Sequence, residues 1–331
     1  MVVEEERKNR MSYIIAEIGI NHLGNDDIMA KLITDSAEAG ADAIKFQYWS
    51  SPDVFTSEGQ PFYHEFVKNT LTKNQVRNIF SLCKRLGVDC FGTASDTNDL
   101  AFLVNNFDMK YIKIGSDDLT NIPLLEFAAG LGKPIILSTG MGTMAEIRNA
   151  YNILSKGNEE EVIVMYCLSS YPAKFEDIDG YKMEELRKEF YNTGLSDHTR
   201  GNKAALLFYG QRDNALKIFE KHVTLSHKLP GPDHHFSADM KEFAEYCDDI
   251  RAMDKMTSNA HKDTESDMRK IARKSLVYGS NLGIGDILDE EWISVKRPGT
   301  GIEPARLKEF VNRELKTEVN EGDLLKEEDF E

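Results

Sequence analysis

Short runs of β-branched and aromatic residues alternate with longer amphipathic stretches over most of the chain. This alternation occurs eight times between residue 13 and about residue 256, and it is typical of parallel strands connected by helices. The predicted strands are residues 13–18, 43–47, 88–92, 111–114, 134–138, 162–167, 193–196 and 216–221. Eight such units predict a closed (β/α)8 barrel, the TIM-barrel fold of the α/β class.

The predicted helices follow the strands, and several end at a glycine. The clearest helical patterns are residues 27–39, 73–86, 122–131 and 144–154, and a glycine comes directly after the first three of them. Glycine is favoured there because helices often end in a left-handed residue. The order of helix, glycine and strand supports the barrel, whose strands would bring their carboxyl ends, and the chemistry, to one face.

The chain changes character after residue 257. Residues 258–270 (SNAHKDTESDMRK) are polar and suit an exposed linker, whereas apolar residues are scattered among glycines and acids from residue 271 onward. In this tail, GDILDEE at 285–291 resembles GDLLKEE at 322–328, which indicates a compact pseudo-symmetric module. The predicted organisation is therefore a barrel at 1–257, a linker at 258–270 and a small domain at 271–331.

Composition narrows the class of protein. The 331 residues are 41% hydrophobic and 29% charged, enough to bury a large core, and the net charge of -16 argues against nucleic acid and anionic membranes as partners. The charged segment 1–10 lacks an apolar signal core, and no stretch approaches the roughly 20 apolar residues of a membrane span. The four cysteines show no CxxC spacing, so neither disulfides nor a thiolate zinc site is expected. We expect a cytoplasmic protein.

Polar residues occur at nearly every predicted strand end. They are Glu17, Lys45, Gln47, Thr93, Lys113, Ser116, Asp118, Ser138, Tyr171, Ser196, His198 and His222. Each alone could simply cap a strand or helix, but their joint placement favours a site. Lys45 and Lys113 end runs that otherwise look buried, where an unpaired ammonium is costly, so a phosphate or carboxylate ligand is expected.

Two of these residues, His198 and His222, follow neighbouring predicted strands. A single histidine is more often structural than a metal ligand, but two at adjacent strand ends indicate a shared divalent cation with open positions for water and substrate. Imidazole ligands favour manganese, cobalt or zinc over calcium, and magnesium stays open.

Several motifs resemble the sialic acid synthase family, whose members make nonulosonic acids. They are IIAEIGINHLGN, AGADAIKFQ, YIKIGSDDLTNIPLL, GKPIILSTGM, GLSDHT, EKHVTL and LPGPDH, and the similarity spans almost the whole chain. The segment VKRPGTG at 295–301 resembles the β-rich antifreeze-like (SAF) domain that follows the barrel in that family.

The resemblance implies an enzyme that condenses phosphoenolpyruvate with an N-acylated hexosamine and releases phosphate. Its metal, usually manganese, would be held by His198 and His222, and Glu17 or a metal-bound water would handle protons. The residues implied around phosphoenolpyruvate are Lys45, Thr93, Lys113, Ser116, Ser138 and Ser196. Those implied around the sugar are Glu17, Gln47, Asp118, Ser169, Tyr171 and Asp233, with Arg297 from the SAF domain. In this family the SAF domain reaches over the barrel of a partner protomer, so a domain-swapped homodimer is expected.

Departures from the family pattern bear on the sugar. Asp118 stands where the family usually has glutamate, Ser169 where it often has asparagine, and the loop at 48–70 is compact. N-acetylmannosamine and a diacetamido-trideoxyhexose leading to legionaminic or pseudaminic acid all stay open. Two other interpretations are a Schiff-base aldolase that uses Lys45 or Lys113 and a non-catalytic protein that binds sugar or ice, against which the intact set of polar strand ends argues.

Overall fold

A computed structural model describes residues 12–51, 56, 58, 63–94, 96–156, 161–210, 217–257 and 263–330. Three parts of the predictions lie outside these residues: the charged segment 1–10, the first residue of the predicted eighth strand, and the first five residues of the predicted linker. Much of the loop at 48–70 also lies outside them. Among the described residues, no helix has the length and apolar character needed to cross a bilayer.

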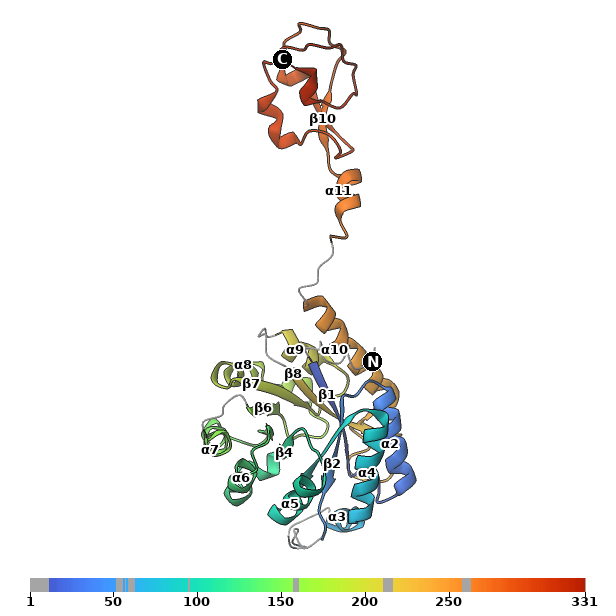
Figure 1. Ribbon diagram of the computed structural model, residues 1–331, viewed down its shortest axis with the longest axis vertical. Helices are drawn as coiled ribbons and strands as arrows, with labels where there is room; N and C mark the ends of the chain where they lie inside the picture. The colour runs from blue at the N-terminus through green and yellow to red at the C-terminus, as the bar shows by residue number, and fades with distance from the viewer. Residues whose placement is uncertain are drawn as a thin grey trace. The chain divides into compact units, whose positions relative to one another are not determined.

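Eight parallel strands close into a barrel, with helices on its outside (Figure 1). Neighbouring strands pair in chain order, and β8 pairs with β1 from Ser12↔Lys217 to Glu17↔His222, which closes the ring. The strands are β1 (Ser12–Gly19), β2 (Ala43–Tyr48), β3 (Asp89–Ala94), β4 (Ile112–Ile114), β5 (Ile135–Ser138), β6 (Val162–Cys167), β7 (Asn192–Asp197) and β8 (Lys217–Thr224). A two-residue strand, β9 (Ala238–Asp239), extends the sheet beside β8. The predicted TIM barrel is confirmed.

Several helices begin at a capping residue or end at a glycine that the sequence supplies. Thr72 and Thr143 each form a capping box with the residue three positions later, and Gly87 ends α4 with a φ of 68°. The barrel helices are α2 (Asp26–Glu38), α3 (Tyr63–Lys68), α4 (Lys73–Leu86), α5 (Thr97–Asn106), α6 (Ile122–Ala129), α7 (Met144–Ser155), α8 (Gly180–Glu189), α9 (Lys203–Gly210) and α10 (Met240–Thr257). These caps satisfy terminal backbone groups that would otherwise lack partners.

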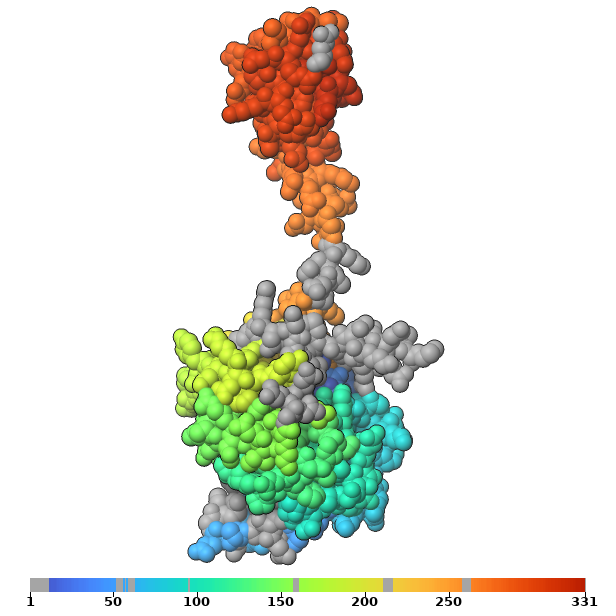
Figure 2. All heavy atoms as spheres, turned by 60° about the vertical axis from the view of Figure 1, so that its left-hand side comes forward, coloured from blue at the N-terminus to red at the C-terminus, as the bar shows by residue number. Residues whose placement is uncertain are grey.

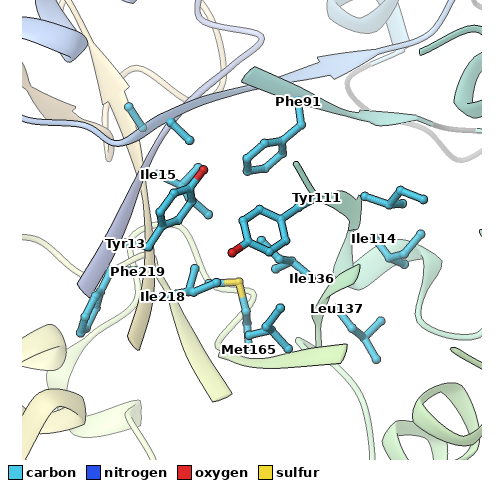
Figure 3. Packing of buried hydrophobic residues seen from close by; sticks show 14 of the residues in the cluster. Tyr13, Ile15, Phe91, Tyr111, Ile114, Ile136, Leu137, Met165, Ile218 and Phe219 are labelled. Carbon is cyan, nitrogen blue, oxygen red and sulfur yellow. The ribbon is translucent and has the colours of Figure 1, made fainter. Parts of the chain in front are cut away.

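A layer of mainly apolar side chains lies inside the barrel. Side chains alternate between the two faces of a strand, and each strand contributes one residue to this layer, which for β4 is the residue just before it. We call it the apolar layer: Ile15, Ala43, Phe91, Tyr111, Ile136, Met165, Gly194 and Ile218. Figure 3 shows Ile15, Tyr111 and Met165 converging in the centre, whereas Phe219, the residue after Ile218, lies outside this group. The barrel is therefore a packed core rather than a pore.

The described residues 263–330 belong to a second compact unit, drawn in orange and red in Figure 2. It contains α11 (Ser266–Ala272) and an antiparallel pair, β10 (Ser275–Tyr278) and β11 (Ile293–Lys296). Leu282 and Val319 pair with each other, and Leu288 and Leu325, at the same position of the two similar segments, are both buried. The pseudo-symmetry predicted from the sequence is thus present in the structure.

The linker differs from the expectation in one respect. Helix α11 begins at Ser266, inside the predicted 258–270 linker. Its residues include methionine, arginine, lysine and alanine, which are favourable in helices even where the surrounding sequence is polar. Assignment of the second unit to the SAF type stays a prediction.

Candidate active site

A cavity of about 580 Å³ opens at the carboxyl ends of the barrel strands. Residues from β2 to β8 line it, and so do the loops that follow β4, β6 and β8. Barrel enzymes place their sites at this end, as the sequence predicted.

The bottom of the cavity is formed by inward-facing strand residues, which the two-residue periodicity of the strands places there. Two residues beyond each member of the apolar layer, the side chain again faces inward, but it is now polar or a thiol. We call this the polar layer: Glu17, Lys45, Thr93, Lys113, Ser138, Cys167, Ser196 and Glu220. All of these except Glu17 line the cavity, and Glu17 is fully buried beside Lys45.

Four charged groups meet in the polar layer. Lys45 Nζ lies 2.8 Å from Glu17 Oε2 and 3.5 Å from Glu220 Oε1, and Lys113 Nζ lies 3.7 Å from Glu220 Oε2. Lys45 also donates to Thr93 Oγ1 at 3.1 Å, and Lys113 donates to Ser138 Oγ at 2.7 Å.

Burial and these contacts change the pKa of each group. Burial lowers the pKa of Lys113, which Glu220 only partly offsets, whereas for Lys45 the two carboxylates outweigh burial and raise the pKa. Burial raises the pKa of Glu17; burial acts the same way on Glu220, but the two lysines outweigh it and lower the pKa of that carboxyl. Lys45 Nζ is thus paired with two carboxylates, whereas Lys113 Nζ has a single carboxylate oxygen 3.7 Å away and is the ammonium less fully compensated. An anionic ligand would complete this arrangement.

The two histidines stand at the next inward position of β7 and β8, with ring centroids 5.5 Å apart. His198 Nδ1 lies 2.8 Å from the carbonyl oxygen of Leu168. A carbonyl oxygen can only accept, so Nδ1 carries a proton, and in the neutral ring Nε2 then has the free lone pair. Burial lowers the pKa of His198, but Cys167 and the carbonyl of Leu168 outweigh it and raise this pKa. His222 Nδ1 is buried and has no hydrogen-bond partner among the described residues. Burial lowers the pKa of His222 well below its usual value, with a smaller contribution from His198.

This donor set fits a divalent cation. Metal-bound histidines usually donate their other ring N–H to a carbonyl or carboxylate, as His198 does, and a ligating imidazole must be neutral, as burial favours for His222. Asp233 Oδ2 lies 3.8 Å from His222 Nδ1, and burial raises the pKa of Asp233 to about 6.

Gly19 lets three functional groups converge. A β carbon at this position would lie 3.2 Å from Glu17 Oε1, 3.4 Å from Asp233 Oδ2 and 3.6 Å from His222 Cε1, and the φ of Gly19 is 49°. Both the crowding and the left-handed backbone favour glycine. Glu17 Oε1 is itself buried without a hydrogen-bond partner among the described residues, so it is available to a ligand.

Two aromatic rings, those of Tyr171 and Phe236, pack against the histidines. The ring of Tyr171 lies 4.4 Å from that of His198 and 5.0 Å from that of Phe236, which in turn lies 5.1 Å from the ring of His222. These rings replace water on one side of the imidazoles, which strengthens electrostatic interactions within the cavity.

Every barrel residue predicted for the site lies in or beside the cavity. Gln47, Ser116, Asp118, Ser169, Tyr171 and Asp233 line it with the polar layer and the histidines. Arg297 lies in the second unit, where its side chain is exposed. Burial raises the pKa of Asp118 to about 6, although Asn121 donates to Asp118 Oδ1 at 2.8 Å.

Several residues of the cavity lining could not be picked out from the sequence, and four of them bear on the chemistry or on the polarity of the site. Glu220 was hidden inside a predicted strand, although its spacing of two from His222 and Ile218 places it on the inward face. Cys167 was expected only as a buried thiol; it is a buried free thiol, but it also lines the cavity and lies 3.4 Å from Ser116 Oγ. Trp49 and Phe236 come from loops with no pattern to identify them.

A separate group of potential metal ligands lies outside the cavity. Among the described residues, His227, Asp239 and Glu242 could hold an ion together. However, Asp239 and Glu242 accept hydrogen bonds from each other's backbone N–H at the start of α10, a capping arrangement that explains their proximity. The His198 and His222 pair, buried and facing the cavity, is the better candidate.

Comparisons with known proteins identify the family. The profile of the NeuB family matches residues 32–262, more than half of the chain. The chain belongs to the NeuB family. The resemblance to sialic acid synthases that the motifs predicted, and with it the enzyme class, is confirmed.

Relatives of this NeuB-family chain cover nearly its whole length. An uncharacterized protein of Methanocaldococcus jannaschii is 36% identical over 96% of this chain and 94% of its own. The N,N′-diacetyllegionaminic acid synthase of Campylobacter jejuni is 30% identical over 96% of this chain and 100% of its own. The crystal structure of the N-acetylneuraminic acid (sialic acid) synthetase of Leptospira borgpetersenii, in complex with citrate, has a TM-score of 0.71 and 30% identity, covering 78% of this chain and 90% of that chain.

Proposed function

We propose that this NeuB-family enzyme condenses phosphoenolpyruvate with an N-acylated amino sugar to give a nonulosonic acid and phosphate. The observation that carries the proposal is the juxtaposition of an anion pocket, built on Lys45 and Lys113, with a pair of imidazoles on the next inward position of β7 and β8. An anionic three-carbon substrate fits the first, and a carbonyl substrate held by a cation fits the second.

Phosphoenolpyruvate would lie in the polar layer. Lys45 and Lys113 supply positive charge, and the hydroxyls of Thr93, Ser138 and Ser116 supply short donors for phosphate and carboxylate oxygens. Gly140 N donates to Ser116 Oγ at 3.0 Å, and a β carbon at Gly140 would lie only 2.2 Å from Ser169 Oγ. Glycine at position 140 therefore leaves room for the hydroxyls of Ser116 and Ser169, which line the cavity.

His198 and His222 would hold the divalent cation, which we expect to be manganese, with magnesium or cobalt as alternatives. When bound, such a cation polarises the carbonyl oxygen of the open-chain sugar. The protein's own contribution is to orient the ring of His198 through its N–H to Leu168 and to favour the neutral form of His222 through burial.

The reaction forms a carbon–carbon bond between C3 of phosphoenolpyruvate and the aldehyde carbon of the sugar. Water adds to C2, and the bond between C2 and the phosphate oxygen then breaks, so that sugar, phosphoenolpyruvate and water give the acid and phosphate. Glu17 is suited to accept and return a proton because burial holds its pKa above the usual range and Oε1 lacks a partner among the described residues. Asp118 is a second candidate for proton transfer.

The sugar would lie toward the cavity mouth, near Gln47, Asp118, Ser169, Tyr171 and Asp233. Arg297 of a partner protomer would bind its N-acyl group, which requires the domain-swapped homodimer expected from the resemblance. The exposed side chain of Arg297 is compatible with such a role. The cytoplasmic location also stays a prediction.

The function is tested by supplying phosphoenolpyruvate, Mn²⁺ and one sugar at a time, and by measuring the product mass. The candidates are N-acetylmannosamine and the diacetamido-trideoxyhexoses of the legionaminic and pseudaminic series. We expect one of them to give a product three carbons longer, with one phosphate released per product. Borohydride trapping of a lysine adduct, with turnover insensitive to chelators, would instead establish the Schiff-base aldolase.

A further inference from the structure

A buried ion pair lies directly behind the two histidines. Lys221 Nζ is 3.0 Å from Asp197 Oδ2, and their side chains are 3% and 0% exposed. The two residues are register partners on β7 and β8. Each of them comes immediately before one of the histidines in the sequence.

The pair is on the outer face of the barrel wall. His198 and His222 face the cavity, so the residues before them face the surrounding helices. Contacts support this assignment: the ring of Phe219, on the same face of β8, lies 5.7 Å from that of Phe208 on α9, and Lys221 Nζ lies 5.0 Å from the ring centroid of Tyr246 on α10. The ion pair therefore cannot touch substrate, and any effect on the site must act through the histidines.

Lys221 also binds the backbone that carries His198. Besides Asp197, its ammonium donates to the carbonyl oxygens of Thr199 at 2.6 Å and Gly201 at 2.9 Å. Asp197 Oδ1 accepts from Thr199 N at 2.9 Å and from Thr199 Oγ1 at 2.7 Å. The strand end that presents His222 is thus tied to the turn that presents His198.

The three donors of the ammonium are all used, one on each acceptor. Buried ion pairs contribute little net stability compared with apolar residues of similar volume, and their best-attested role is to fix register. This pair joins the two strand ends that carry the proposed metal ligands. By fixing the register of β7 against β8, it would also fix the distance between the two imidazoles.

We propose that Asp197 and Lys221 are positioning residues that hold His198 and His222 at the separation required to bind one divalent cation. The proposal rests on the proposed function, because it takes the histidines as the metal ligands. Such a pair behaves like the hydrogen-bonding groups behind other metal sites, whose loss typically weakens metal affinity about 10-fold to 100-fold.

The test measures the Mn²⁺ dissociation constant of the metal-free full-length protein by calorimetric titration. We expect Lys221→Met to weaken Mn²⁺ binding about 10-fold to 100-fold. Lys221→Arg keeps a cationic donor for Asp197 and is expected to recover most of that loss. Asp197→Asn, a smaller change that retains an acceptor for Thr199, is expected to weaken binding in the same direction and provides a second variant if Lys221→Met fails to fold.

Lys217 offers a matched control. It is on the same strand and the same outer face, four residues before Lys221, and is 3% exposed with its ammonium 4.9 Å from the ring centroid of Tyr209. Lys217→Met removes a buried ammonium stacked on a tyrosine, but at the strand end remote from the histidines. We expect its Mn²⁺ affinity to equal that of the wild type.

His198→Ala distinguishes failure of the proposed metal site from failure of the positioning role alone. If it abolishes Mn²⁺ binding while Lys221→Met and Asp197→Asn bind as tightly as Lys217→Met, the positioning role is overturned and the proposed function stands. If His198→Ala leaves Mn²⁺ affinity unchanged, the metal site fails and the positioning role fails with it. Weakened binding in Lys221→Met and Asp197→Asn, recovery in Lys221→Arg and none in the control would support the proposal.

Discussion

The apolar layer and the polar layer use the same eight strands but differ in what burial does. Ile136 and Ile218 stabilise the barrel, since burying such a side chain contributes about 1.5–3 kcal/mol. Two residues further along the same strands, Ser138 and Glu220 are also buried, yet burial of polar groups costs free energy unless they find partners. The first layer specifies the fold, whereas the second, to which we assign the chemistry, lowers stability wherever its polar groups lack partners.

Some buried side-chain atoms have no hydrogen-bond partner among the described residues. Twelve such atoms occur, and five of them, two of Glu17 and one each of Glu220, His222 and Ser169, lie in the polar layer or at the cavity. Such atoms are rare in proteins and point to a ligand or to strain. Substitutions in the two layers should therefore separate activity from stability.

The largest effect is expected from His222→Ala or His198→Ala. Loss of the cation removes several kcal/mol of charge stabilisation, so kcat/KM should fall by about 10³-fold or more. Circular dichroism should show an intact fold, because neither ring belongs to the apolar layer. Unchanged metal content in the purified variants would contradict the assignment.

Lys113→Met should affect phosphoenolpyruvate specifically. Removing a buried cation from an anion pocket typically costs about 2–5 kcal/mol of binding, so we expect the KM for phosphoenolpyruvate to rise by about 10²-fold. Lys113→Met also takes from the buried Glu220 carboxylate one of its two cationic partners, so some loss of thermal stability is expected beside the effect on KM. A strong loss of stability with unchanged KM would place Lys113 with the apolar layer.

Ile136→Ala should give the opposite pattern. Truncating this fully buried side chain is expected to lower the free energy of unfolding by about 2–5 kcal/mol. Denaturant titration measures this loss, and kcat/KM per folded molecule should stay close to that of the wild type. A large drop in kcat/KM at full folding would show that the two layers are not separable.

A smaller effect is expected from the ionisation of Asp118. Its pKa is raised to about 6 by burial, so its carboxylate form is lost as the pH falls through that value. If this carboxylate accepts hydrogen bonds from the sugar as we propose, kcat/KM for the sugar should decline below about pH 6, and the decline should be smaller in Asp118→Asn; Asp233, whose pKa is also raised to about 6, accounts for the rest. Asp117→Asn, a neighbour that also lines the cavity, serves as the control and should keep the full decline; a decline in Asp118→Asn as large as in the wild type would remove Asp118 from this role.

Much of the barrel could be predicted from the sequence because its signals are local. Helix α4 was expected at 73–86 and spans Lys73–Leu86, and β6 was expected at 162–167 and spans Val162–Cys167. The eighth strand was expected to end at residue 221, but β8 continues to Thr224 because His222 and Thr224 keep the inward alternation. The predicted end was too early because polar residues such as His222 and Thr224 are more typical of a loop than of a buried strand.

The site was predictable only in part, because its partners are remote in sequence. Lys45 and Lys113 were recognised as buried cations that need an anion, but part of that need is met by Glu220, which barrel closure brings within 3.7 Å of both. No pattern in the sequence links these three residues. Phe236 likewise reaches His222 through a loop without regular structure. The identity of the sugar could not be predicted. Asp118 and Ser169 are shorter than the residues usual in the family, but a shorter side chain does not show which sugar group it would contact.

The most direct test of the central claim is phosphate release in an omission experiment. Metal-stripped protein is assayed with phosphoenolpyruvate, the sugar identified by product mass, and Mn²⁺, and each component is left out in turn. We expect phosphate release only when all three are present, and we expect His222→Ala to be inactive in the complete mixture. Phosphate release that continues without the sugar, or that is unchanged by removal of the metal, would contradict it.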